Sequence, residues 1–225
     1  MTPYHAVLFD LDGTLLDTAA DLGSALNHLL KEENLPPQPM HAIRVFAGNG
    51  CRGLLRLGFN ITETDERYPA FCERLLDLYE YYMLEQTCLF DGMAETLAFV
   101  EKNQIQWGIV TNKPERFTTP LMEHLSLNKR AHCIISGDTL PFRKPHPAPI
   151  LHACQLLAAR PQHTLYIGDM KSDVEASRRA GTAPLTALYG YIPATEQPKE
   201  WDATGWLDHP TDLMQWLKTP AENIS

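Results

Sequence analysis

The sequence has little basic charge and no long apolar run. Its 28 aspartates and glutamates outnumber its 19 lysines and arginines, which gives a formal net charge of -9. This excess of negative charge opposes binding to nucleic acid and to anionic membranes, so we expect neither as a partner. No apolar stretch approaches the roughly 20 residues that a membrane-spanning helix needs. The chain also does not open on the basic and apolar segments of a signal peptide. We therefore expect a cytoplasmic protein.

Cysteines are few, and repeats are lacking. The five cysteines are scattered, and no spacing between them matches a zinc site or a CxxC redox motif. We therefore expect reduced thiols, as is typical of cytosolic proteins. The absence of repeats and low-complexity tracts argues against a solenoid. The length of 225 residues suits one large domain, or a core domain that carries a smaller one.

Short apolar runs alternate with helical patterns over much of the chain. The predicted strands are 5–9, 106–111, 132–136, 164–168 and 183–188. The predicted helices between the later runs are 92–103, 115–125, 147–158 and 172–180. This alternation predicts an α/β fold, in which a Rossmann-like, three-layer core holds a parallel sheet covered on both faces.

The stretch 18–85 breaks this alternation. Apolar residues from Leu22 to Leu30 follow helical spacing, and Thr18 is the expected N-cap. Another helical pattern runs from Phe71 to Tyr82, and no convincing strand interrupts the region. The stretch therefore predicts a small helical cap domain, inserted directly after the first strand.

This insertion divides the chain into two predicted domains. The catalytic core would comprise 1–17 and 86–225, and the cap would comprise 18–85. The sheet is expected to resume near Cys88 to Asp91. The hinges of a cap that closes and opens would lie near 16–18 and 86–89.

Polar side chains follow four of the predicted strands, at the sheet edge where open α/β proteins bind ligands. In chain order they are Asp10 and Asp12, Thr111 and Asn112, Lys144, and Asp169 with Asp173. Each has an ordinary explanation by itself, because Asp also starts turns and favours the first turn of a helix. Their joint occurrence at successive strand ends favours a functional site.

Asp10 and Asp12 are two residues apart at the end of an apolar strand. Such residues point the same way in an extended segment, so both carboxylates are expected to face one pocket. Adjacent carboxylates repel each other and raise each other's proton affinity. Mg²⁺ would relieve this repulsion, since it prefers oxygen ligands, and Asp169 is the expected third contributor.

These residues, in this order, resemble the motifs of the haloacid dehalogenase superfamily of phosphatases. The segment Asp10-Leu11-Asp12-Gly13-Thr14 is similar to the first motif of that family. The later motifs are matched by Thr111, by Lys144, and by Gly168-Asp169 with Asp173. The resemblance spans nearly the whole chain, and the predicted insert resembles the helical cap of the phosphoglycolate phosphatase branch.

The resemblance implies a Mg²⁺-dependent phosphomonoester hydrolase that acts on a small phosphorylated metabolite. Asp10 would be the nucleophile and form an aspartyl-phosphate, while Asp12 would act as general acid and then as general base. Mg²⁺ would be bound by Asp10, the backbone carbonyl of Asp12, and Asp169. Asp173 would support the water shell of the metal or help to hold Lys144.

The same resemblance assigns the phosphoryl-binding groups. Thr111 and the backbone of Asn112 would hold phosphoryl oxygens, whose charge Lys144 would neutralise. Positioning and electrostatics of this kind supply most of the acceleration in phosphoryl transfer.

Other activities of the superfamily are alternatives. A dehalogenase needs neither a metal nor an acid at position 12, so Asp12 and Asp169 argue against it. A phosphonatase would need a Schiff-base lysine in the cap, where Lys31 is the only lysine. A phosphosugar mutase stays open. A non-catalytic binding protein also stays open, although the presence of Asp10 and Lys144 argues against it.

Substrate specificity is expected to come from the cap. Around Gly50, Arg44 and Arg52 could receive a substrate carboxylate, although a plain turn with two solvated arginines is the alternative. Phosphoglycolate and N-acetylmuramic acid 6-phosphate both carry a carboxylate, so this loop does not separate them. Segments that flank the motifs, such as 107–114 and 189–192, resemble N-acetylmuramic acid 6-phosphate phosphatases.

Overall fold

A six-stranded parallel sheet forms the centre of the protein, which a computed structural model describes over residues 4–218. The outer ends of the predicted core, 1–3 and 219–225, lie outside the described residues. The strand order is β5-β4-β1-β6-β7-β8. The strands are β1 (Ala6–Phe9), β4 (Gln106–Val110), β5 (Cys133–Ile135), β6 (Thr164–Gly168), β7 (Ala183–Ala187) and β8 (Gly205–Leu207). The predicted α/β fold is thus confirmed, with β8 as an additional strand.

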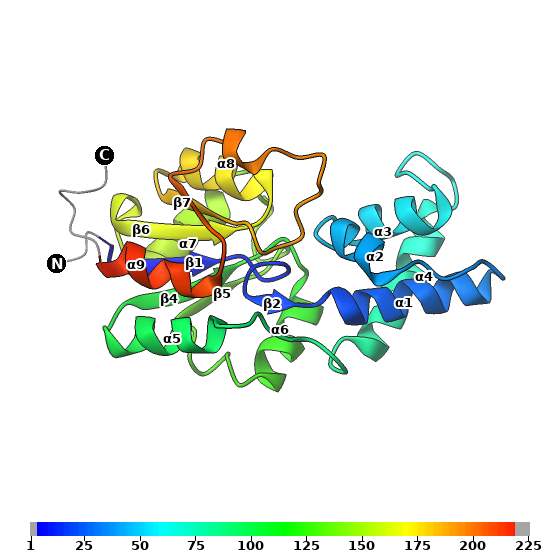
Figure 1. Cartoon of the computed structure of the whole chain (residues 1–225), viewed down its shortest axis with the longest axis horizontal. Helices are drawn as coiled ribbons and strands as arrows, with labels where there is room; N and C mark the ends of the chain where they lie inside the picture. Colours follow the sequence, from blue (N-terminus) through cyan, green and yellow to red (C-terminus); the bar gives the residue numbers. More distant parts are fainter. Residues whose placement is uncertain (1–3, 219–225) are drawn as a thin grey trace.

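Helices cover both faces of this sheet (Figure 1). Successive residues of a strand point to opposite faces, so Val7 and Phe9 pack on one face while Ala6 and Leu8 pack on the other. The first face is covered by α5 (Met93–Lys102), α6 (Glu115–His124) and α9 (Leu213–Lys218). The second is covered by α7 (Ala148–Leu156) and α8 (Lys171–Ala180). This arrangement is the predicted three-layer core.

A helical insert lies beyond one end of the sheet, to the right in Figure 1. Its helices are α1 (Ala19–Glu32), α2 (Met40–Ala47), α3 (Gly50–Phe59) and α4 (Tyr68–Tyr82). They share a separate apolar cluster that includes Leu26, Ile43, Leu54 and Leu78. The predicted insert is therefore present, while its division from the core at 17/18 and 85/86 stays a prediction.

The two connections between sheet and insert pair with each other. Strands β2 (Leu16–Asp17) and β3 (Cys88–Leu89) form a separate two-stranded antiparallel sheet. The expectation that the main sheet resumes near Cys88 to Asp91 was therefore wrong. The chain enters and leaves the insert side by side, so the backbone groups of β2 and β3 pair with each other rather than with the parallel sheet.

The cysteine prediction needs a similar correction. Cys51 of α3 and Cys72 of α4 form a disulfide, whereas Cys88, Cys133 and Cys154 are free thiols. The expectation of reduced thiols was wrong for this pair because the two cysteines are 21 positions apart in the sequence, which gives no sign that α3 packs against α4. Within residues 4–218, no helix is both long and apolar enough to cross a membrane.

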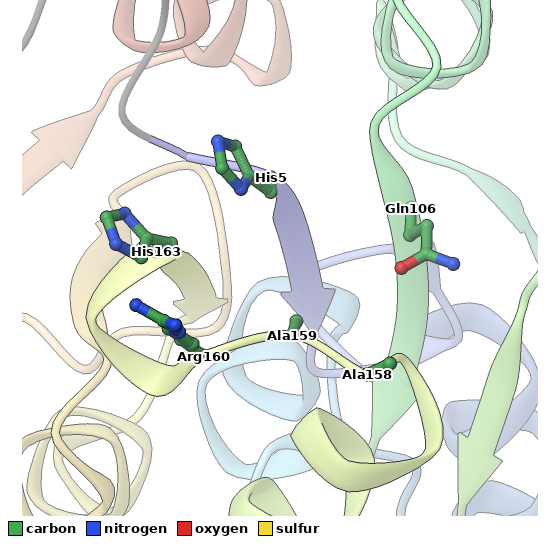
Figure 2. Close-up of a pocket in the computed structure, with 6 residues that line it drawn as sticks. All are labelled: His5, Gln106, Ala158, Ala159, Arg160 and His163. Carbon is green, nitrogen blue, oxygen red and sulfur yellow. The ribbon is translucent and has the colours of Figure 1, made fainter.

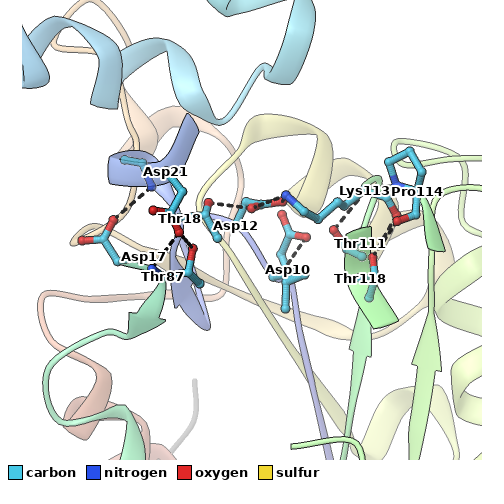
Figure 3. Close-up of polar contacts among 12 residues, drawn as sticks. Asp10, Asp12, Asp17, Thr18, Asp21, Thr87, Thr111, Lys113, Pro114 and Thr118 are labelled. Atoms are coloured by element: carbon cyan, nitrogen blue, oxygen red, sulfur yellow. Dashed lines mark hydrogen bonds and ion pairs between the residues drawn. The ribbon is translucent and has the colours of Figure 1, made fainter. Parts of the chain in front are cut away.

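Asp21, in the first turn of α1, fastens the returning chain to the insert. Its side chain is fully buried. The carboxylate accepts hydrogen bonds from the backbone N–H groups of Gln86 at 3.0 Å and Thr87 at 2.8 Å, and from the Thr87 hydroxyl at 2.7 Å. Figure 3 shows this contact beside the start of α1.

We predict that Asp21→Ala lowers the free energy of unfolding by about 2–3 kcal/mol, because buried donors lose their acceptor. Urea denaturation measures this change. Asp77→Ala removes an exposed carboxylate from α4 and should change stability by less than about 0.5 kcal/mol. Equal losses in the two variants would contradict the role given to Asp21.

Candidate active site

Asp10 stands at the carboxyl end of the central strand. Its backbone N–H donates to the Ile167 carbonyl at 2.8 Å, so the residue extends the pairing of β1 with β6. Its Oδ1 accepts the N–H of Leu11 at 2.7 Å and lies 2.9 Å from Nζ of Lys144. A strand end thus fixes the Asp10 carboxylate next to a cation.

The Lys144 ammonium group is held on several sides. It donates to Asp173 Oδ1 at 2.6 Å and to the Tyr166 hydroxyl at 2.7 Å, besides pairing with Asp10. Only 5% of Lys144 is exposed. Burial alone would lower the pKa of Lys144, but the charges of Asp10 and Asp173 raise that pKa above its usual value. The lysine is therefore charged and fixed.

Asp173 serves two structural purposes at once. While Oδ1 accepts a hydrogen bond from Lys144, Oδ2 accepts the backbone N–H of Met170, the residue before α8, at 2.9 Å. The helix start and the lysine are thereby tied to one buried carboxylate. Both uses that the sequence suggested for Asp173, a helix-start charge and a support for Lys144, occur together.

Three buried carboxylates gather here, from Asp10, Asp169 and Asp173. Each offers one oxygen, and these oxygens lie within 4.8 Å of one another. Burial raises the pKa of Asp10 to about 6, with Lys144 opposing this effect and Asp173 adding to it. Burial, followed by the charges of Asp10 and Asp173, raises the pKa of Asp169 well above its usual value.

This set of side chains fits a divalent cation. Among the described residues, Lys144 is the one ammonium paired with this group, and it contacts Asp10 and Asp173 but not Asp169, so two negative charges would be uncompensated if all three carboxylates were ionised. Oxygen is the ligand atom that Mg²⁺ prefers, and a bound divalent cation would offset the repulsion. Asp173 already accepts a backbone N–H at the start of α8, whereas Asp10 and Asp169 do not, so these two are the better candidates to bind the cation.

The turn after β1 wraps around Asp169. Asp169 Oδ1 accepts the Thr14 hydroxyl at 3.1 Å, and Oδ2 accepts the backbone N–H of Tyr191 at 2.8 Å. Gly13 has a φ of 81°, and a Cβ at this position would overlap the Asp169 carboxylate. Two features therefore require glycine at position 13: the left-handed backbone conformation and the close approach of the Asp169 carboxylate.

Asp12 lies outside the carboxylate cluster. Its Oδ1 accepts the Thr18 hydroxyl at 2.6 Å and lies 2.9 Å from Nζ of Lys113, which Figure 3 shows reaching toward it beside Asp10. Asp10 and Asp12 are thus neighbours at one strand end, but their carboxylates have different partners. Metal binding by the Asp12 carbonyl stays a prediction.

Lys113 is a site residue that sequence reasoning missed. Its side chain is buried, with Nζ 4.5 Å from the centre of the Tyr79 ring of α4. Burial alone would lower the pKa of Lys113, but the charge of Asp12 raises that pKa above its usual value. The signal available was a lysine directly after the polar strand end Thr111-Asn112.

Asn112 positions the Lys144 segment. Its side-chain amide donates to the Lys144 carbonyl at 3.0 Å and accepts the Lys144 N–H at 3.0 Å. The buried hydroxyl of Thr111 accepts the N–H of Lys113 at 3.2 Å. The predicted residues at this strand end therefore lie in the same network as Lys144 and Lys113, and their phosphoryl contacts stay predictions.

Within the described part of the chain, the residues predicted to bind substrate in the insert make no hydrogen bond or ion pair with the carboxylate cluster. Arg44 donates to both oxygens of Asp17, at 3.0 and 2.7 Å. The exposed Arg52 donates to Asn49 at 3.2 Å. A Cβ at Gly50, whose φ is 55°, would meet no atom within 4 Å. Substrate binding by these three residues stays a prediction.

A pocket opens at the opposite edge of the sheet, at the amino ends of β1, β4 and β6 (Figure 2). It is lined by His5, Gln106, Ala158, Ala159, Arg160 and His163. None of the residues predicted for catalysis or metal binding contributes to it.

Comparison with known proteins identifies the family of the chain. The model of a family described as haloacid dehalogenase-like hydrolase matches residues 7–187. N-acetylmuramic acid 6-phosphate phosphatase of Pseudomonas putida is 38% identical over 209 residues, which are 93% of this chain and 94% of that protein. Phosphoglycolate phosphatase of Xanthomonas campestris pv. campestris is 37% identical over 211 residues, or 94% and 95% of the two chains.

A solved structure extends the agreement to the fold. The crystal structure of a predicted phosphoglycolate phosphatase from Haemophilus somnus has a TM-score of 0.82 and 27% sequence identity. The likeness covers 96% of this chain and 98% of the other. The resemblance found in the motifs is thus confirmed, and the chain belongs to the haloacid dehalogenase-like hydrolases.

Proposed function

We propose that the protein is a cytoplasmic, Mg²⁺-dependent phosphatase that hydrolyses a small phosphomonoester through an aspartyl-phosphate on Asp10. The observation that carries this proposal is the carboxylate of Asp10, buried between the Lys144 ammonium and the oxygens of Asp169 and Asp173. Relatives that are named as phosphatases support hydrolysis of phosphoric monoesters. A fixed cation beside the nucleophile would stabilise the charge of the transferring phosphoryl group.

The chemistry divides between Asp10 and Asp12. An Asp10 oxygen attacks phosphorus as the bond to the leaving oxygen breaks, and Asp12 donates a proton to that oxygen. Asp12 then takes a proton from water, whose oxygen attacks phosphorus and releases phosphate from Asp10. Mg²⁺, held by Asp10, Asp169 and the Asp12 carbonyl, would supply additional positive charge at the phosphoryl oxygens.

The remaining residues orient these two aspartates. Lys113 and Thr18 contact the carboxylate of Asp12, which supports a role in directing it. Lys144 would neutralise phosphoryl oxygens, and Thr111 with the backbone of Asn112 would hold them. Asp173 would act through Lys144, which it contacts at 2.6 Å.

Two substrates fit the proposal, 2-phosphoglycolate and N-acetylmuramic acid 6-phosphate. Relatives named for each are similarly related to the chain, at 37% and 38% identity. Each substrate carries a carboxylate for an arginine of the insert. Arg52 is exposed, whereas Arg44 would first have to exchange Asp17 for the substrate.

We predict that the protein with Mg²⁺ releases phosphate from at least one of these esters, and that Asp10→Asn lowers kcat at least about 1000-fold by removing the nucleophile. Phosphate release from both esters, measured side by side, tests this and selects the substrate. Asp77→Asn, on the exposed face of α4, is the control and should retain full activity. An Asp10→Asn protein as active as its parent would refute the mechanism.

We predict opposite effects of Asp169→Asn on metal binding and on stability. Loss of a carboxylate should weaken Mg²⁺ binding at least about tenfold, measured by titration calorimetry. Because the raised pKa of Asp169 means that its ionised form destabilises the folded state, the metal-free variant should melt at a higher temperature than the parent above neutral pH. Asp208→Asn, at an exposed position, should change neither the Mg²⁺ affinity nor the melting temperature. Unchanged Mg²⁺ affinity in Asp169→Asn would contradict the metal assignment.

We predict that Lys113→Met lowers kcat at least about tenfold, because Asp12 loses the cation that directs its carboxylate. Steady-state phosphate release measures kcat, and a thermal melt verifies that the variant is folded. Lys129→Met removes an exposed lysine and should leave kcat unchanged. Full activity in folded Lys113→Met would show that Asp12 needs no such partner.

A further inference from the structure

Tyr191 lies in the segment after β7, yet it belongs to the interior of the insert. Only 1% of the residue is exposed, and it packs in the apolar cluster that α1–α4 form. The guanidinium carbon of Arg44 from α2 lies 5.1 Å from the centre of its ring. A Cβ at Gly48, between α2 and α3, would lie 3.6 Å from Cβ of Tyr191. The ring therefore packs against the insert.

The hydroxyl of Tyr191 caps the first turn of α1. It accepts the backbone N–H groups of Thr18 at 2.7 Å and Ala19 at 3.0 Å, and it donates to Asp17 Oδ1 at 2.7 Å. The first N–H groups of a helix have no partner within the helix, and a nearby side chain usually satisfies them. The hydroxyl of Thr18 does not fill this role: it makes no capping hydrogen bond and donates to Asp12.

The backbone of Tyr191 binds the carboxylate cluster. Its N–H donates to Asp169 Oδ2 at 2.8 Å. The preceding residue is Gly190, where a Cβ would overlap both Asp169 and the Gly13 carbonyl. This close approach places the N–H of Tyr191 at the carboxylate while its hydroxyl, across the ring, reaches α1.

We propose that Tyr191 is a positioning residue that couples the Asp169 carboxylate to the start of the helical insert. This inference depends on the proposed function only because it takes Asp169 as a Mg²⁺ ligand. The backbone N–H of Tyr191 binds this carboxylate and its hydroxyl binds Thr18, where the expected hinge of the insert ends. An ion bound at Asp169 therefore alters the first turn of α1, and by linkage the placement of that turn alters the affinity for the ion.

Tyr191→Phe tests the coupling, since it keeps the ring and the backbone N–H but removes the hydroxyl. Tyr189→Phe is the matched control, because the Tyr189 hydroxyl donates to the Thr14 carbonyl at 3.2 Å and not to α1. Amide hydrogen exchange, resolved by NMR, is measured at Thr18 and Ala19 in the full chain. Dispersed spectra verify that each variant is folded.

In the metal-free proteins, the Thr18 and Ala19 amides should exchange at least about fivefold faster in Tyr191→Phe than in the parent or in Tyr189→Phe. Saturating Mg²⁺ should change these two rates in the parent and in Tyr189→Phe, but not in Tyr191→Phe. A purely structural tyrosine would not remove the response to Mg²⁺.

An equal Mg²⁺ response in Tyr191→Phe and its parent would overturn the inference. Equal metal-free exchange rates would also overturn it, because the hydroxyl would then not cap α1. Failure of Mg²⁺ to shift any resonance near Asp169 in the parent would instead refute the proposed metal site, and the metal-free comparison would still decide whether Tyr191 positions α1.

Discussion

Lys144 and Asp10 form a buried ion pair, and the arrangement of the surrounding side chains follows from it. A lone carboxylate buried this deeply would take up a proton, and a lone buried ammonium would lose one. Each group stays charged because the other is 2.9 Å away. Tyr166, Asp173 and the amide of Asn112 then hold the lysine from β6, α8 and the end of β4. The result is a carboxylate, the proposed nucleophile, with a fixed cation beside it.

The strand order explains how distant parts of the chain reach this pair. In the parallel sheet β4 and β6 flank β1, so Asn112 and Asp169 follow the two strands beside the one that ends at Asp10. The same edge also receives the insert, whose Tyr79 ring lies against Lys113. A single edge of the sheet therefore brings together the proposed nucleophile, the carboxylate cluster and the part of the molecule proposed to select the substrate.

Much of this arrangement could be predicted because local patterns carry it. Apolar runs of strand length predicted β1, β4, β5, β6 and β7, and polar residues at their ends predicted the Asp10 cluster. Residues whose roles depend on packing escaped prediction. Lys113 and Tyr191 matter because of what lies across from them, namely Asp12 and the start of α1, and the disulfide depends on α3 lying against α4. Strands β2 and β8 were missed because each contains or adjoins only two consecutive apolar residues, Leu15-Leu16 and Trp206-Leu207, whereas the similarly short β5 is apolar throughout.

The most direct test of this account is to trap the proposed covalent intermediate. The protein, mixed with Mg²⁺ and an ester that it hydrolyses, is quenched in acid during turnover, treated with borohydride and digested for mass spectrometry. The account predicts that Asp10 is reduced to homoserine, because borohydride reduces an acyl phosphate but leaves a free carboxylate intact. Reduction at another aspartate, or no reduction at Asp10 while a rapid burst of product shows that an intermediate accumulates, would contradict it.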